Sequence, residues 1–147
     1  MKVYRLVPLI SVCFLVGCAT APQKPAPGGN LPECGLLPNC VNSESGQAGS
    51  AVAPLHATVL QWQQLKRWLK SQDDWTITED TGDFVQAVVT TPLMRFRDDV
   101  QLQFVQAAGV IEVRSSSRLG ISDMGTNRRR VELLRKQIGD GNGDAAN

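Results

Sequence analysis

A long alternation of apolar and polar residues over positions 94–104 constrains the fold more than any other feature of this sequence. Its apolar members share one parity, with charged or amide residues on the other: Met94, Phe96, Val100, Leu102 and Phe104. This alternation predicts a strand with one buried face. Residues 107–109, Ala-Ala-Gly, turn the chain, and residues 110–115 return as a second strand. So short a connection joins antiparallel neighbours, so the pair is a hairpin.

Asp98 interrupts this pattern, because it falls on the apolar parity. Either the strand bulges there, or a carboxylate points inward and needs a charged partner, since an unpaired buried carboxylate would become neutral. Asp99, its neighbour, points to the opposite face of a regular strand. The two carboxylates therefore cannot act together as a paired acid and base.

Further strands and two helices complete the expected domain. Residues 75–79 and 84–91 are rich in β-branched side chains and flank a turn, so they predict two more strands. Helices are predicted over residues 57–71, whose apolar stripe includes Val59 and Trp62, and over residues 125–138, before Gly139. The prediction is an α+β fold: an antiparallel sheet of about four strands packed by an N-terminal and a C-terminal helix.

The N-terminus indicates export from the cytoplasm. Lys2 and Arg5 precede an apolar run that ends in Leu15-Val16-Gly17-Cys18. This pattern predicts a signal peptide over residues 1–17, and its end is similar to the lipobox of bacterial lipoproteins. Cys18 would then carry the acyl chains, palmitate among them, that hold the protein on a membrane. The sorting pattern of such lipoproteins favours the outer membrane when Ala follows the lipidated Cys, with the domain facing the periplasm.

Residues 18–33 are rich in Pro, Gly and Ala and predict a flexible tether, while residues 139–147 predict a disordered tail. The globular domain is then residues 34–138. Without Lys2 and Arg5 the chain keeps 13 basic and 14 acidic residues. No charge argument for nucleic acid remains.

The mature domain keeps two cysteines, Cys34 and Cys40. In an oxidising periplasm their spacing of six most simply predicts a disulfide. A metal site lacks ligands, because His56 is the only histidine. Neither a metal nor a cofactor is expected.

The richest polar stretch is residues 114–130, R-S-S-S-R-L-G-I-S-D-M-G-T-N-R-R-R. Together with residues 37–43, L-P-N-C-V-N-S, and residues 97–100, R-D-D-V, it resembles the family of domain of unknown function 1499. Three motifs in this order make the resemblance specific. It implies a family but no activity. Ile121 stands where the family often has an aromatic residue.

The polar stretch has three candidate roles. As scaffold, Arg114 and Arg118 would pair with Asp98 and Asp99, while its serines and Asn127 would bond the loop backbone. As a binding site, the basic side chains near the start of the last helix would hold an anionic ligand or an envelope protein. The residues proposed for that site are Arg114, Ser115, Ser117, Arg118, Ser122, Asp123, Asn127, Arg128 and Arg130.

The third role is a hydrolase-like enzyme that uses the Ser, Asp and Arg cluster. A nucleophilic serine needs a base, and His56 has no sequence link to these serines. We therefore interpret the chain as a lipid-anchored envelope protein with a non-catalytic binding or interaction domain, and no catalytic residue is assigned. The enzyme predicts a solvent-open pocket where the three residue types converge, whereas the scaffold predicts Arg114, Asp98 or Asp99, and Asn127 buried and mutually bonded.

Overall fold

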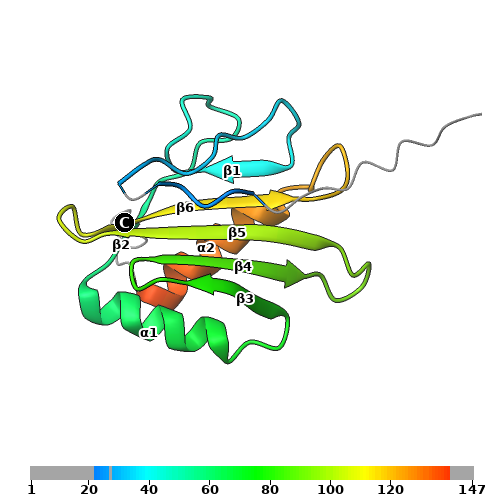
Figure 1. Ribbon diagram of the computed structural model, residues 1–147. Coiled ribbons are helices and arrows are strands. Elements are labelled where there is room, and N and C mark those ends of the chain that lie inside the picture. Colours follow the sequence, from blue (N-terminus) through cyan, green and yellow to red (C-terminus); the bar gives the residue numbers. More distant parts are fainter. Residues whose placement is uncertain (1–21, 27, 140–147) are drawn as a thin grey trace, which may run out of the picture.

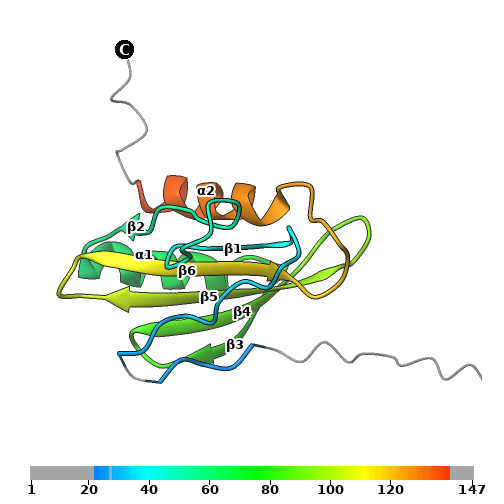
Figure 2. The same cartoon turned by 90° about the horizontal axis from the view of Figure 1, so that it is seen from above.

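The fold is a six-stranded antiparallel sheet with two helices on one face (Figures 1 and 2). The computed structural model describes residues 22–26 and 28–139. The predicted signal peptide, Cys18 and residues 140–147 of the predicted tail lie outside the described residues. The strand order is β1-β6-β5-β4-β3, and β2 also pairs with β6. This arrangement confirms the α+β class and the antiparallel sheet.

The strands differ greatly in length: β1 (Cys40–Asn42), β2 (Leu55–His56), β3 (Trp75–Asp80), β4 (Phe84–Thr90), β5 (Arg97–Val105) and β6 (Val110–Ser117). The four long ones are those that alternation or β-branched composition predicted, and β5 and β6 form the expected hairpin. The count of four was too low. β1 and β2 have three and two residues, too short to show a periodic pattern.

The strand predicted over residues 94–104 extends less far toward the N-terminus than the alternation indicated. β5 begins at Arg97, and Met94 and Phe96 lie exposed in the loop before it. Arg95 has φ 51°, a left-handed conformation that a strand cannot contain. The apolar residues of this loop are therefore not part of the buried face of the sheet.

The helices are α1 (Val59–Lys70) and α2 (Thr126–Ile138). A capping box between Thr58 and Gln61 starts α1, whose buried stripe is Trp62, Leu65 and Leu69. Val59, predicted on this stripe, is exposed. α2 ends at Gly139, which takes the left-handed conformation at φ 71° that suits glycine.

Both faces of the sheet are covered. The helices bury one face around a core that includes Trp62, stacked at 5.7 Å on Phe104 of β5. Residues 22–26 and 28–33, here called the N-terminal strap, lie along the other face (Figure 2). Gln101 of β5 donates to the Gln23 carbonyl at 3.1 Å, and Lys24 pairs with Glu79 of β3 at 2.8 Å.

The strap makes contacts with the domain that its linker-like composition did not indicate. Its Leu31 is buried, and its Pro32 carbonyl accepts a hydrogen bond from Asn42 of β1. Because this cover adds to that of the helices, six of the seven residues of β4 are buried. The described elements share one sheet and one core, so they form a single domain. No helix among them is long and apolar enough to cross a membrane.

Candidate functional site

The polar side chains of β5 and β6 divide between the two faces of the sheet. Alternation along β6 directs Ser115 toward α2, and directs Arg114 and Ser116 toward the N-terminal strap. The same alternation on β5 separates Asp98, on the helix side, from Asp99, on the strap side. The sequence therefore encodes two polar clusters rather than one.

The cluster on the helix side is closed. Arg130 of α2 pairs with Asp98 at 2.6 Å, and the same guanidinium donates to Ser115 Oγ at 2.9 Å and to Asn127 Oδ1 at 2.6 Å. Ser115 also donates to Asn127 Oδ1 at 2.6 Å. All four side chains are buried. Asp98 thus points inward with a charged partner, and that partner is Arg130.

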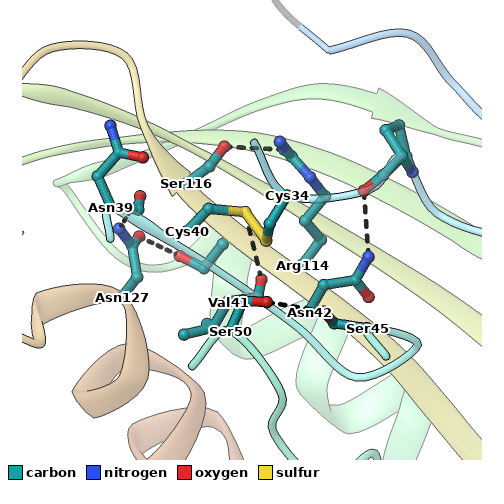
Figure 3. Close-up of a disulfide and its surroundings, with 12 residues drawn as sticks. Cys34, Asn39, Cys40, Val41, Asn42, Ser45, Ser50, Arg114, Ser116 and Asn127 are labelled. Carbon is teal, nitrogen blue, oxygen red and sulfur yellow. Dashed lines mark hydrogen bonds between the residues drawn. A yellow bond between two sulfur atoms is a disulfide. The ribbon is translucent and has the colours of Figure 1, made fainter. Parts of the chain in front are cut away.

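Asn127 joins this cluster to the residue before β1. Its amide nitrogen donates to the Asn39 carbonyl at 2.9 Å and to Ser117 Oγ at 3.0 Å (Figure 3 shows the Asn39 bond). Asp123 fixes the start of α2, because its carboxylate accepts from the backbone of Gly125 and of Asn127. The polar groups of this cluster have structural partners, which is what the scaffold interpretation predicts for Asn127 and Asp98.

The cluster on the strap side borders an open pocket of about 380 Å³. Arg118 holds Asp99 in a two-pronged ion pair, with Nε–Oδ2 at 2.8 Å and Nη2–Oδ1 at 2.7 Å. Arg114 and Ser116 line the same pocket, together with Pro22 and Pro32 of the strap. The pocket therefore lies between the sheet and the strap.

Arg114 is the residue of this pocket whose charge is least compensated. One Nη donates to Ser116 Oγ at 2.8 Å (Figure 3), while its buried Nε has no acceptor among the described residues. No carboxylate of the described chain lies within ion-pair distance of Arg114. Burial lowers the pKa of Arg114, and the attraction of Asp99 partly opposes this effect. The pKa of Arg118 is raised by its hydrogen bonds to Asp99.

A disulfide supports the pocket from one side. Cys34 and Cys40 are joined, as the sequence predicted, and Cys40 lines the pocket (Figure 3). Because Cys34 follows the strap and Cys40 begins β1, the bond fastens the end of the strap to the sheet. This covalent link limits how far Pro32 can move away from Arg114.

Several predicted site residues lie elsewhere. Arg128 donates to the carbonyls of Gly49 and Ala51, so it holds the chain before β2 and not the pocket. Ser122 accepts from the Met124 backbone in an exposed loop. Arg130, predicted to face a ligand, is buried against Asp98, and Arg114, predicted to pair with Asp98 or Asp99, has no ion pair among the described residues. The predicted site is therefore reduced to Arg114, Ser117 and Arg118.

Sequence reasoning missed Ser116 and Asn39, which also line the pocket. Alternation along β6 was the signal available for Ser116, because it places residues 114 and 116 on one face. The hydroxyls and carboxylates of both clusters are engaged with other side chains of the described chain. Ser115 is 0% exposed, and in the pocket both oxygens of Asp99 accept from Arg118 while Ser116 accepts from Arg114.

Comparison with known families and structures gives one result. The model of a family described as "Protein of unknown function (DUF1499)" matches residues 30–138, which is most of the chain, and confirms the resemblance of the three motifs. No curated protein and no solved structure matches the chain.

Proposed function

We propose that this chain, which belongs to the DUF1499 family of proteins of unknown function, is a lipid-anchored protein of the bacterial envelope whose domain binds a small anionic ligand in the pocket beside Arg114. The ligand class is a carboxylate or phosphate group on a small molecule. One observation carries the binding role: a guanidinium without an ion pair among the described residues lines a pocket beside the hydroxyl of Ser116.

The charges of the pocket support this ligand class. Arg118 and Asp99 neutralise each other at 2.7 Å, which leaves the charge of Arg114 for a ligand. A guanidinium stays protonated in proteins and binds planar or tetrahedral oxyanions through parallel N–H groups. The pocket volume of about 380 Å³ lies in the range of small-molecule sites. A single net positive charge fits a monoanionic group better than a polyanion.

The test of the pocket uses residues 19–147, which lack Cys18, and thermal unfolding with inorganic phosphate, glycerol 3-phosphate or D-alanyl-D-alanine. A ligand that binds the native state raises the unfolding midpoint by mass action. We expect at least one of the three to raise the midpoint of the wild type and to have no effect on Arg114→Gln.

The matched control is Arg67→Gln, which removes the same charge from an exposed position on α1. This variant should respond to the ligand as the wild type does. If no probe shifts the wild type, or if Arg67→Gln loses the shift as fully as Arg114→Gln, the pocket is not the anion site.

The lipid anchor is tested separately in a bacterial host. The full chain should incorporate labelled palmitate and fractionate with the outer membrane, whereas Cys18→Ala should incorporate none. Ala19→Asp changes the residue after the lipidated position and should keep the label while moving the protein to the inner membrane. Equal labelling of the wild type and of Cys18→Ala would remove lipid anchorage from the proposal and leave the pocket untouched.

The alternative function, a hydrolase that uses the same Ser, Asp and Arg residues, has less support. Asp99 lies in the pocket with Ser116 and both arginines, as that alternative requires. Its oxygens, however, are both engaged by Arg118, so it is a poor base for the Ser116 hydroxyl. We therefore propose binding without catalysis.

A further inference from the structure

Three loops at one end of the sheet carry most of the exposed large apolar side chains of the described chain. Residues 91–96, before β5, expose Leu93, Met94 and Phe96. Residues 118–125, after β6, expose another three: Leu119, Ile121 and Met124. These two loops emerge at the same end in both views (Figures 1 and 2).

The third loop is the disulfide loop of residues 34–39, which exposes Leu36 and Leu37. It lies against residues 118–125, because Asn39 donates to the Gly120 carbonyl at 2.9 Å. The Arg118 backbone in turn donates to the Arg97 carbonyl at 3.2 Å, which joins the second loop to the start of β5. We call these three contiguous loops the apolar end.

Exposure on this scale needs an explanation. Leu93 is 90% exposed and Met124 is 86% exposed, although most residues of β5 and β6 beside them are buried or half-buried. Single exposed apolar residues are ordinary on protein surfaces, whereas contiguous groups of them mark contacts with membranes or partners. The backbone also presents them at some cost, since Arg95 and Met124 both take left-handed conformations at φ 51° and 52°.

The charges at this end match an anionic lipid surface. The 93–97 segment reads Leu-Met-Arg-Phe-Arg, so two exposed arginines alternate with the apolar residues. Neither Arg95 nor Arg97 has an ion pair within the described chain. Asp123, the acidic residue of the three loops, is occupied with the backbone of Gly125 and Asn127. Asp73 and Asp74, between α1 and β3, lie beside this end, since the Asp74 carbonyl accepts from the Thr90 backbone at 2.9 Å.

The path of the chain brings this end toward a membrane. Pro22, where the described chain begins, lines the pocket beside Ser117 and Arg118, so the strap starts at the apolar end. Cys18 precedes Pro22 by four positions, a span of at most about 14 Å when extended. A lipid on Cys18 would therefore hold the apolar end close to the bilayer.

We propose that the apolar end docks on a membrane surface that contains anionic phospholipids. Its leucine, methionine, isoleucine and phenylalanine side chains enter the boundary between headgroups and acyl chains, while Arg95 and Arg97 contact lipid phosphates. The orientation argument rests on the lipid anchor of the proposed function. The surface itself does not, because its residues belong to the folded domain.

The experiment is flotation of residues 19–147, which carry no acyl chain, with vesicles of phosphatidylethanolamine and phosphatidylglycerol. We expect the wild type to float with these vesicles. The triple variant Leu119→Ser, Ile121→Ser, Met124→Ser should lose binding by about tenfold or more, because three inserting side chains are removed. Arg95→Gln with Arg97→Gln should lose binding in a way that added salt reproduces in the wild type.

The matched control is Val59→Ser, Leu60→Ser, Val105→Ser, which removes three exposed apolar side chains at the opposite end of the sheet. It should float as the wild type does, and circular dichroism verifies that all variants are folded. If either triple variant is unfolded, smaller variants replace both. Leu93→Ser with Met94→Ser then tests the apolar end, and Leu60→Ser is the control.

No flotation of the wild type would overturn the proposal, as would equal losses in the two triple variants. If the domain floats and its apolar-end variants bind fully, another surface of the domain contacts the vesicle and the proposal is also overturned. Because no protein in this assay is acylated, the result is independent of whether Cys18 is lipidated in cells.

Discussion

Arg130 of α2 and Asp98 of β5 form an ion pair of 2.6 Å between side chains that are 7% and 2% exposed. The pair joins the last helix to the centre of the sheet, and Ser115 and Asn127 complete its hydrogen bonds. Through this pair, polar side chains of the 114–130 stretch become part of the buried interior.

Arg130→Met should strongly destabilise the domain, because it leaves the carboxylate of Asp98 buried without a partner. We expect a loss of about 3–5 kcal/mol in the free energy of unfolding, measured with urea. Adding Asp98→Asn should recover part of this loss, since the buried charge is then removed. A loss below about 1 kcal/mol for the single variant would show that water reaches Asp98.

Arg114 and Arg118 should respond in opposite ways to loss of their charge. Arg118→Met leaves Asp99, which is 3% exposed, without its ion pair and should lower stability. Arg114→Met removes a guanidinium whose buried Nε has no acceptor in the described chain, so unfolding should require the same free energy or up to about 1 kcal/mol more. Urea unfolding measures both. Clear destabilisation by Arg114→Met would assign Arg114 to the scaffold.

The disulfide should contribute about 2 kcal/mol to stability, because it closes a loop with a sequence separation of six. The double variant Cys34→Ser, Cys40→Ser should remain folded, since the core of the sheet and helices does not include the loop. Urea unfolding of the wild type in dithiothreitol should match that of the variant. Loss of the folded state in either case would mean that the strap is needed to hold the sheet together.

Asp80 should give a small pH dependence at acid pH. Partial burial favours its neutral form, but hydrogen bonds from Lys66 and Lys70 outweigh this and lower its pKa from 3.8 to about 2. The contribution is therefore present above about pH 4 and is lost as the pH falls toward 2. Solvent screens this exposed cluster, so it should be worth at most about 1 kcal/mol.

Asp80→Asn is the test of that contribution. The variant should be slightly less stable than the wild type at pH 7, and the difference should disappear as the pH falls through about 2. Adding salt should reduce the difference at pH 7. The same difference at both pH values would show that the substitution acts on the turn that precedes β4 and not through the charge.

Local patterns were sufficient for the elements that bury a regular stripe. Trp62, Leu65 and Leu69 identified α1, and the alternation at Val100, Leu102 and Phe104 identified β5. Alternation also showed that Asp98 occupies a position where an apolar residue is expected. These predictions succeeded because period and burial are properties of a single segment.

Partners across the fold could not be predicted from local patterns. Asp98 has five arginines in the polar stretch to choose from, and only the packing of α2 against β6 selects Arg130. The contacts of the strap could not be predicted for the same reason, since its composition is that of a linker while its partners are Gln101 and Glu79. Some residues of the pocket were predicted. The division of the β6 side chains between the two faces of the sheet was not, although the alternation along β6 indicates it.

The N-terminal strap also holds a stretch of chain against the sheet that could otherwise extend away from it. About a dozen residues between Pro22 and Cys34 are folded back along the sheet, held by a few hydrogen bonds and the ion pair of Lys24. Peeling them away would extend the connection by roughly 40 Å while leaving the helices and their core in place. The disulfide sets the limit of that extension, because tension beyond Cys34 acts on β1 and its ladder with β6. If Cys18 carries the proposed lipid, the reach of the domain from the membrane would therefore depend on whether the strap lies against the sheet.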